Sequence, residues 1–326
     1  MKSFLRLRSS LISIYKNNEI ILNMLAKFVI SFICLLSVNS IVNFSGHGIQ
    51  SIIVSVFIGL TSLILPMYVM LIVMMGLVIL VASLSGLILS AVLSGIAAMI
   101  YILYIRLFKK EAVIIMLTIL LLPTTGIYLV VLISPLFFGI GGIGAIFCGG
   151  ILYHILKIMP TLINTAFNSG LKLDTIFAQI DVILTYILGR TIYDQRFLAT
   201  MAILMVVFLV VYLIRIWTID YALYIAVFCG AVTNILGFSV AQIMIDVDLN
   251  LPIMVGSTVI CALVGFFVSF MSRVLDYNRA QVVQFEDDEN YYFVKVIPKI
   301  ELSPKRDNLY PYSAMETMDD DIIIEI

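Results

Sequence analysis

Few side chains inside the apolar stretches of this sequence have the chemistry of a cavity or a gate. Asn234 and Gln242 are among the deepest strong hydrogen-bonding side chains, and Asn234 follows Thr233 near the middle of its stretch. Pro123 and Gly126 interrupt another stretch, because both residue types break helices. We take Pro123, Gly126, Asn234 and Gln242 as the candidate cavity or gate. For Asn234, the alternative is a polar contact between packed helices.

The sequence lacks the motifs of hydrolytic, nucleotide and metal chemistry. It has no glycine-rich phosphate loop, no HExxH and no GxSxG pattern. The cysteines stand singly and the histidines lie near stretch ends without a partner at metal-ligand spacing, so packing is the expected role of both. These residues are Cys34, Cys148, Cys229, Cys261, His47 and His154. We predict no catalytic residue, no cofactor and no metal, and a protein that is not an enzyme.

Charged residues lie almost entirely at the ends of the apolar stretches. Ionisable groups at mid-bilayer mark proton relays and ion-coupled sites, and the sequence shows no conspicuous pathway of that kind. Asp220 lies at one end of a predicted helix, and Asp246 and Asp248 lie at the other end. At 1.5 Å per residue this helix is about 36 Å long. These three carboxylates are therefore not expected to form one cation site.

The composition identifies the solvent of these helices as lipid. The chain of 326 residues is 62% hydrophobic and 12% charged, whereas soluble proteins are about 45–50% apolar and about 25% charged. Lipid offers no hydrogen-bond partners, so unbroken apolar runs cross it as helices, and these runs lack the alternation of a barrel. The predicted fold class is all-α, a polytopic transmembrane helix bundle.

About eight spans and one interrupted segment are predicted from stretches of roughly 20 apolar residues. The stretches are residues 20–44, 49–65, 67–84, 86–108, 113–138 with 139–158, 197–217, 220–244 and 251–275. Basic residues in 2–16 and 106–110 favour the cytoplasm for both regions, and Arg215, Arg273 and Arg279 prefer the same side. These preferences agree only if residues 113–158 cross an odd number of times. We therefore predict a re-entrant or discontinuous helix there and cytoplasmic N- and C-termini; the alternative is a kinked span with an outward-facing tail.

Small residues recur every four positions in several stretches and predict close helix packing. Such ridges let backbones approach and gain dispersion contacts that lipid cannot match. The alternative is that these ridges serve sliding helices or subunit contacts. The predicted packing residues are Gly86, Ser90, Ser94, Gly141, Gly149, Ala226, Gly230 and Gly265.

The domain organisation follows from these stretches. Residues 1–19 form a basic cytoplasmic segment, residues 20–158 a first transmembrane bundle, and residues 197–275 a second bundle. Residues 159–196 contain an amphipathic helix that we expect in the membrane interface or over the bundle mouth, as a connector or a gate. Residues 276–326 form an acidic soluble tail, in which 281–285 and 291–297 read as a β-hairpin with an acidic tip.

The tail also carries a resemblance. The string FEDDENYYFVKVIPK at residues 285–299 resembles the end of a group of functionally unassigned, permease-like polytopic membrane proteins of anaerobic Gram-positive bacteria. The resemblance extends to residues 215–221 and loosely to 106–112. It implies a multi-pass protein of the bacterial cell membrane, and the permease label rests on hydropathy.

We predict a permease-like protein that moves a small or amphiphilic substrate, with the lipid bilayer as its surroundings. Energy would come from a gradient or from an ATPase subunit in the cytoplasm, because the chain has no nucleotide motif. The alternative is a non-transporting scaffold or assembly factor that recruits protein partners through its tail. Nucleic acid is not an expected partner, and a homo-oligomer remains open.

Overall fold

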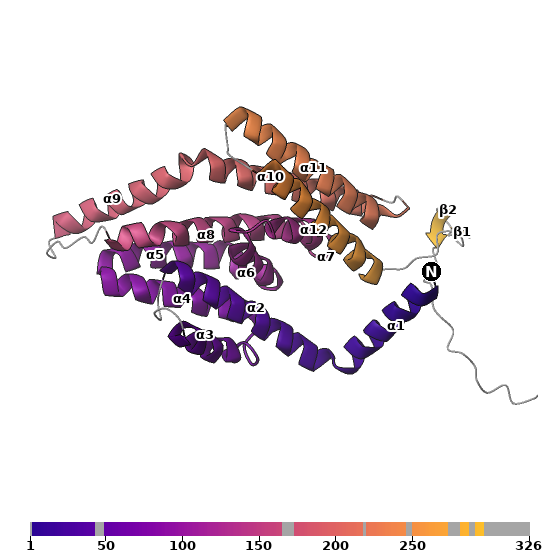
Figure 1. Ribbon diagram of the computed structural model, residues 1–326, viewed down its shortest axis with the longest axis horizontal. Coiled ribbons are helices and arrows are strands. Elements are labelled where there is room, and N and C mark those ends of the chain that lie inside the picture. The colour runs from indigo at the N-terminus through magenta and orange to yellow at the C-terminus, as the bar shows by residue number, and fades with distance from the viewer. Residues whose placement is uncertain are drawn as a thin grey trace, which may run out of the picture. The chain divides into compact units, whose positions relative to one another are not determined.

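The computed structural model describes residues 2–42, 49–164, 173–217, 220–245, 250–272, 281–286 and 291–296. Contacts divide the chain into two units. One is Asn18–Ser272, and the other joins Met1–Asn17 with Arg273–Ile326. The predicted bundles, residues 20–158 and 197–275, therefore lie almost wholly in a single compact unit. Figure 1 shows that unit as a set of helices packed side by side.

Seven helices in the described part of the chain are long and apolar enough to cross a membrane. They are Glu19–Val42 (α2), Met67–Ser85 (α4), Leu87–Ile105 (α5 with η1), Gly142–Ile163 (in α8), Gln195–Ile216 (α10), Ala222–Ile245 (α11) and Leu251–Ser272 (α12). The prediction of a helical multi-pass membrane protein is confirmed at this level. The predicted span 49–65 instead contains α3 (Ile49–Thr61), whose 13 residues rise only about 20 Å.

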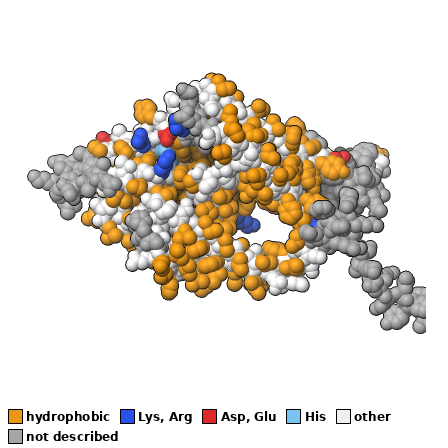
Figure 2. Space-filling view, viewed as in Figure 1, with side chains coloured by type: hydrophobic (Ala, Val, Ile, Leu, Met, Phe, Trp, Pro, Cys, Tyr) orange, Lys and Arg blue, Asp and Glu red, His pale blue; other side chains and the backbone are white. Residues whose placement is uncertain are grey.

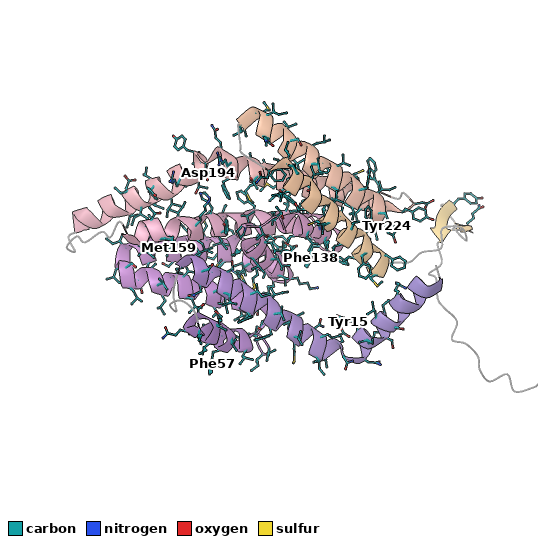
Figure 3. The ribbon with its side chains drawn as sticks, viewed as in Figure 1. Tyr15, Phe57, Phe138, Met159, Asp194 and Tyr224 are labelled. Carbon is teal, nitrogen blue, oxygen red and sulfur yellow. The ribbon has the colours of Figure 1, made fainter. Side chains whose placement is uncertain are left out.

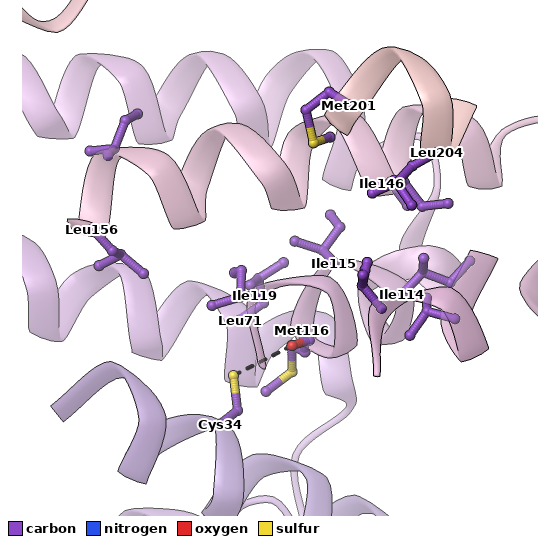
Figure 4. Close-up of a cluster of buried hydrophobic side chains, with 14 of the residues drawn as sticks. Cys34, Leu71, Ile114, Ile115, Met116, Ile119, Ile146, Leu156, Met201 and Leu204 are labelled. Carbon is purple, nitrogen blue, oxygen red and sulfur yellow. Dashed lines mark hydrogen bonds between the residues drawn. The ribbon is translucent and has the colours of Figure 1, made fainter. Parts of the chain in front are cut away.

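The N-terminal helices α2 and α4 pack on each other and on α6 (Ala112–Leu121), and α3 packs on α2. Cys34 of α2 is fully buried, and its Sγ lies 3.7 Å from the Met116 carbonyl of α6 (Figure 4). Asn39 Nδ2 donates to Ser51 Oγ at 2.8 Å and joins α2 to α3. Cys34 therefore serves as a small packing residue at a close helix contact, the role expected from the sequence.

Helices α4 and α5 (Leu87–Ile100) form an antiparallel hairpin in which Gly86 alone is the connection. Its backbone is extended, and nothing lies within 4 Å of a Cβ placed there. Ser94 is exposed, and the hydroxyls of Ser90 and Ser94 bond to their own helix. Gly86 is thus a corner, and Ser94 lies on an exposed face of α5.

Helical structure is interrupted between α6 and α7 (Ile127–Phe137). Thr124 Oγ1 organises the turn, because it accepts from the Gly126 N–H at 3.2 Å and donates to the Leu121 carbonyl at 2.9 Å. Pro123 is exposed in this turn and has no N–H with which to continue α6. The break therefore falls where the sequence contains Pro123 and Gly126.

The outer ends of α6 and α7 meet. Glu111 precedes α6 and Gly141 follows α7, yet a Cβ on Gly141 would lie 2.6 Å from Glu111 Oε1. The guanidinium of Arg215 in α10 donates to the carbonyls of Pro135 at 2.7 Å and Phe138 at 2.9 Å. Both carbonyls lie at the C-terminus of α7, where carbonyl groups lack partners within the helix. Helices α6 and α7 are therefore a hairpin with both ends at the same end of the bundle.

Glycines of α8 (Gly142–Asn164) allow it to pack closely on α6 and α10. A Cβ at Gly149 would lie 2.7 Å from Thr118 Cβ, and one at Gly142 would lie 2.9 Å from Phe208 Cζ. Gly230 of α11 similarly lies against Val211 and Leu132. Of the predicted packing residues, Gly141, Gly149, Ala226, Gly230 and Gly265 are all at tight or buried helix contacts.

Helices α10, α11 and α12 form an antiparallel group that packs on α7, so the hairpin joins the two predicted bundles. Helix α9 (Leu173–Ile192) precedes them and packs on α5, α8 and α10. Its apolar face buries Ile183 and Ile187. Figure 1 shows α9 leading into α10 across a short break.

The smaller unit contains α1 (Lys2–Asn17), β1 (Gln281–Glu286) and β2 (Tyr291–Val296). The strands pair antiparallel, with Gln281 opposite Val296 and Glu286 opposite Tyr291. The predicted acidic tip at 287–290 and the rest of the tail at 297–326 lie outside the described residues.

Two glycines of α12 test the packing. A side chain at Gly265 would contact Val227 Cγ1 at 3.0 Å, whereas nothing lies within 4 Å of Gly256. We expect Gly265→Leu to lower the unfolding free energy by about 1–3 kcal/mol through overpacking. Gly256→Leu has the same change in helix propensity without the overlap and should be neutral or stabilising. Thermal unfolding in detergent measures both, and equal midpoints would contradict the assignment.

Candidate functional site

A cavity of about 700 Å³ lies where α8, α9, α10 and the end of α11 come together. Its volume falls within the roughly 300–1,000 Å³ of small-molecule sites. Its polar lining consists of His154, Lys157, Arg190, Asp194, Gln195 and Arg196, with Thr161, Tyr186 and Tyr193 beside them. Figure 2 shows basic, acidic and histidine side chains gathered at one place on a largely hydrophobic face. We call this the polar cavity.

The polar cavity carries an excess of positive charge. Lys157 comes from α8, Arg190 from the last turn of α9, and Arg196 from the first turn of α10, and all three are exposed. Asp194 is the acidic residue among the lining side chains. Three basic groups against one carboxylate favour an anion, and the N-terminal end of α10 adds a partial positive charge.

The break between α9 and α10 shapes this end of the polar cavity. Tyr193 and Asp194 separate the helices, and Figure 3 labels Asp194 at that point. Asp194 Oδ1 accepts a hydrogen bond from the Phe197 N–H at 3.1 Å and so caps α10. The carboxylate is therefore engaged with the N-terminus of α10.

His154 is the most buried polar side chain of the polar cavity. It is 4% exposed, and its imidazole stacks on Phe197 with ring centroids 4.3 Å apart. The charges of Asp194, Lys157 and Arg190 all act on this ring. Its Nε2 has no hydrogen-bond partner among the described residues. Because a buried polar atom without a partner costs about 1–3 kcal/mol, a hydrogen-bonding group that reached this nitrogen would be stabilised there.

The polar cavity is not evident from the sequence. The pattern predicted interfacial packing for His154, and for residues 159–196 an interfacial connector or a gate. Two weak signals were present: His154 and Lys157 are three residues apart, and so lie on one face of α8, and Asp194 directly precedes a long apolar run as an N-cap does. Neither signal tells which helices meet there.

The predicted cavity or gate residues do not line the polar cavity. Pro123 and Gly126 lie in the turn between α6 and α7. Asn234 is 1% exposed, and its Nδ2 donates to Thr258 Oγ1 of α12 at 2.9 Å. That bond is the interhelical contact that the sequence allowed as the alternative. Gln242 lies one turn before Ile245, which lines the polar cavity, and the Gln242 Oε1 is buried without a partner among the described residues.

Within the described residues, no group of three or more His, Cys, Asp or Glu side chains is arranged to hold a metal ion. Comparison with protein-family models, curated proteins and solved structures found no match. The function is therefore argued from the polar cavity and the helices that form it.

The N-cap at Asp194 can be tested directly. Asp194→Ala removes the bond to Phe197 and should destabilise the start of α10 by about 1 kcal/mol. Asp194→Asn keeps a capping oxygen and should retain most of the stability. Thermal unfolding in detergent, with hydrogen exchange at residues 195–199 as a local readout, compares the two. Equal protection in the Ala and Asn variants would contradict the capping role.

Proposed function

We propose that this chain is a permease-like protein of the bacterial cell membrane and that the polar cavity receives the anionic group of a small or amphiphilic substrate. The observation that carries the proposal is the convergence of Lys157, Arg190 and Arg196 around the buried His154. Basic groups and an imidazole N–H are the partners of phosphate and carboxylate oxygens. A helix broken beside a substrate site is also a recurring feature of transporters.

The surface beside the polar cavity supports an amphiphilic substrate. Helices α9 and α10 expose Leu188, Ile192 and Leu198 on either side of the break, with exposed fractions of 45–58%. An acyl chain on these residues would remain in an apolar environment while its head group occupied the charged cavity. A small hydrophilic anion would use only the cavity.

The two ends of α10 support an orientation. Arg196 and Arg215 are separated by 19 residues of one helix, or about 29 Å, which is close to the roughly 30 Å of a bilayer's hydrocarbon core. Arg106, Lys109 and Lys110 lie with Arg215 near the joined ends of the α6–α7 hairpin. The positive-inside rule then places the N-terminus and that end in the cytoplasm, and the polar cavity toward the outside.

Helices α6 and α7 would supply the interrupted segment of such a permease. Both ends of the hairpin lie together, and its turn at residues 122–126 is too polar to face lipid without other cover. In this proposal the hairpin re-enters from the cytoplasmic side and the seven long helices cross. Helix α3 runs back along α2, as the Asn39–Ser51 and Ser31–Met67 contacts show, so the start of α2 and residues 106–110 lie on the same side. The predicted scaffold function depends on the tail, most of which lies outside the described residues.

Binding of lysophosphatidic acid to the full-length protein in an uncharged detergent tests the site. We expect saturable binding that exceeds the binding of zwitterionic lysophosphatidylcholine, with inorganic phosphate as a probe of the head group alone. The double variant Arg190→Ala, Arg196→Ala should weaken binding by about tenfold or more, because charged hydrogen bonds are lost. Arg106→Ala removes an exposed arginine from the other end and should leave binding unchanged.

Transport is measured with the same ligand in proteoliposomes. The wild-type protein should move lysophosphatidic acid across the bilayer faster than the double variant does. Equal binding by wild type and double variant would contradict the anion site. Binding without any transport would contradict the permease and favour a receptor or scaffold.

Removal of the tail separates the permease from the scaffold. Deletion of residues 281–326 leaves every residue of the polar cavity in place. We expect the shortened protein to fold and to keep its affinity for lysophosphatidic acid within about twofold, because the tail contributes no lining residue. Fluorescence-detected size exclusion and the binding assay measure both. Retained folding with lost binding would show that the tail is part of the site.

A further inference from the structure

A second polar cluster lies at the other end of α8, where the ends of the α6–α7 hairpin meet. Glu111 is 8% exposed at the end of η2 (Lys109–Glu111). Its carboxyl group is hydrogen-bonded to the hydroxyl of Tyr104, and the same hydroxyl lies 2.5 Å from the Gly141 carbonyl oxygen. Tyr104 belongs to η1 (Tyr101–Ile105), a π-helical turn, and such turns often occur at functional sites.

The hydrogens in this cluster can be counted. A tyrosine hydroxyl has one hydrogen, and a backbone carbonyl can only accept. Two oxygens 2.5 Å apart, as in Tyr104 and Gly141, must share a hydrogen, so the Tyr104 O–H donates to Gly141. The bond between Tyr104 and Glu111 then needs its own hydrogen, which only a protonated Glu111 can supply.

The local packing is built around this carboxyl group. A Cβ at position 141 would lie 2.6 Å from Glu111 Oε1 and 3.0 Å from Phe108, so only glycine leaves room for the acid. A Cβ at Gly144 would similarly lie 2.6 Å from the Tyr104 ring. The Gly141 carbonyl also accepts from the Gly144 N–H at 2.9 Å. The carboxyl, phenol and first turn of α8 thus fit together as one unit.

The surrounding charged groups are engaged elsewhere or exposed. The Arg215 guanidinium is on the carbonyls of Pro135 and Phe138, and Lys109 Nζ lies 5.5 Å from the centroid of the Tyr68 ring. Arg106 and Lys110 are exposed. The Cys148 thiol of α8 interacts electrostatically with the Tyr104 hydroxyl. Burial raises the pKa of Glu111, and the hydrogen bond with Tyr104 opposes this rise more weakly.

We infer that Glu111 is a proton-binding site that holds the two ends of the α6–α7 hairpin together. With the proton bound, Glu111 donates to Tyr104 and Tyr104 donates to Gly141. When the proton leaves, Tyr104 donates to the carboxylate, and its oxygen then faces the Gly141 carbonyl with no hydrogen between them. The contact across the hairpin ends must then loosen.

The direction of the pH dependence follows by linkage. The closed contact binds the proton more tightly than an open, solvated Glu111 does, so the closed contact is favoured at low pH. It is lost as the pH rises through the raised pKa of Glu111. This inference rests on the cluster alone and does not require the anion site at the polar cavity.

Infrared spectroscopy of the full-length protein in nanodiscs tests proton binding. A pH titration should show the carbonyl band of a protonated carboxylic acid persisting above the pH at which ordinary glutamates ionise. Glu111→Gln should remove this band. Glu19→Gln, which changes an exposed glutamate in the first turn of α2, should leave it intact. A band unchanged in Glu111→Gln, or absent from the wild type, would overturn the inference.

Hydrogen exchange at residues 139–145 tests the contact between the two ends of the α6–α7 hairpin. After correction for the intrinsic pH dependence of exchange, the wild-type protein should lose protection by up to about tenfold as the pH rises, in line with loss of the neutral hydrogen bond from Tyr104 to the Gly141 carbonyl. Glu111→Gln keeps a neutral donor and should remain protected across the titration. Tyr104→Phe lacks the bridging hydroxyl and should be weakly protected at every pH. If wild-type protection depended on pH as little as that of Glu111→Gln, the proposed role of Glu111 in this contact would be wrong.

Discussion

Lipid offers no hydrogen bonds, so every break in a membrane helix must be satisfied by the protein itself. The Thr124 side chain bonds to both sides of the α6–α7 turn, Asp194 caps the start of α10, and Arg215 covers the end of α7. Charged side chains of the described chain are therefore engaged where helices begin and end. The polar cavity and the Glu111 cluster both lie at such breaks, where charged side chains meet backbone groups that lack partners in their own helix.

Helix α8 passes by both sites. Its first turn follows Gly141, whose carbonyl contacts Tyr104, and His154 lies 12 residues after Gly142, or about 18 Å along the helix. The glycines between these points bring α8 close to α6 and α10, so that the hairpin and the wall of the polar cavity share one rigid element.

Much of the helical layout could be predicted, and the site could not. The apolar stretches gave the long helices, and Pro123 with Gly126 gave the position of the break. Of the residues chosen as a cavity, Pro123 and Gly126 lie in a turn, Asn234 bonds α11 to α12, and Gln242 lies one turn before a lining residue of the polar cavity. Helix period identifies which residues share a face, but it does not identify the neighbour of that face. Gly86 has the same spacing as Gly265, yet the first is a corner and the second is a packed contact.

The sequence by itself determined that the chain forms long apolar helices with charges at their ends, because hydropathy and backbone hydrogen bonding act locally along the chain. Only the tertiary structure decided which of those ends come together. Lys157, Arg190 and Arg196 belong to three helices, and Glu111 and Gly141 are 30 residues apart. Their sites depend on packing between segments distant in sequence, because the role of a glycine or of a buried carboxyl group is set by the side chain packed against it.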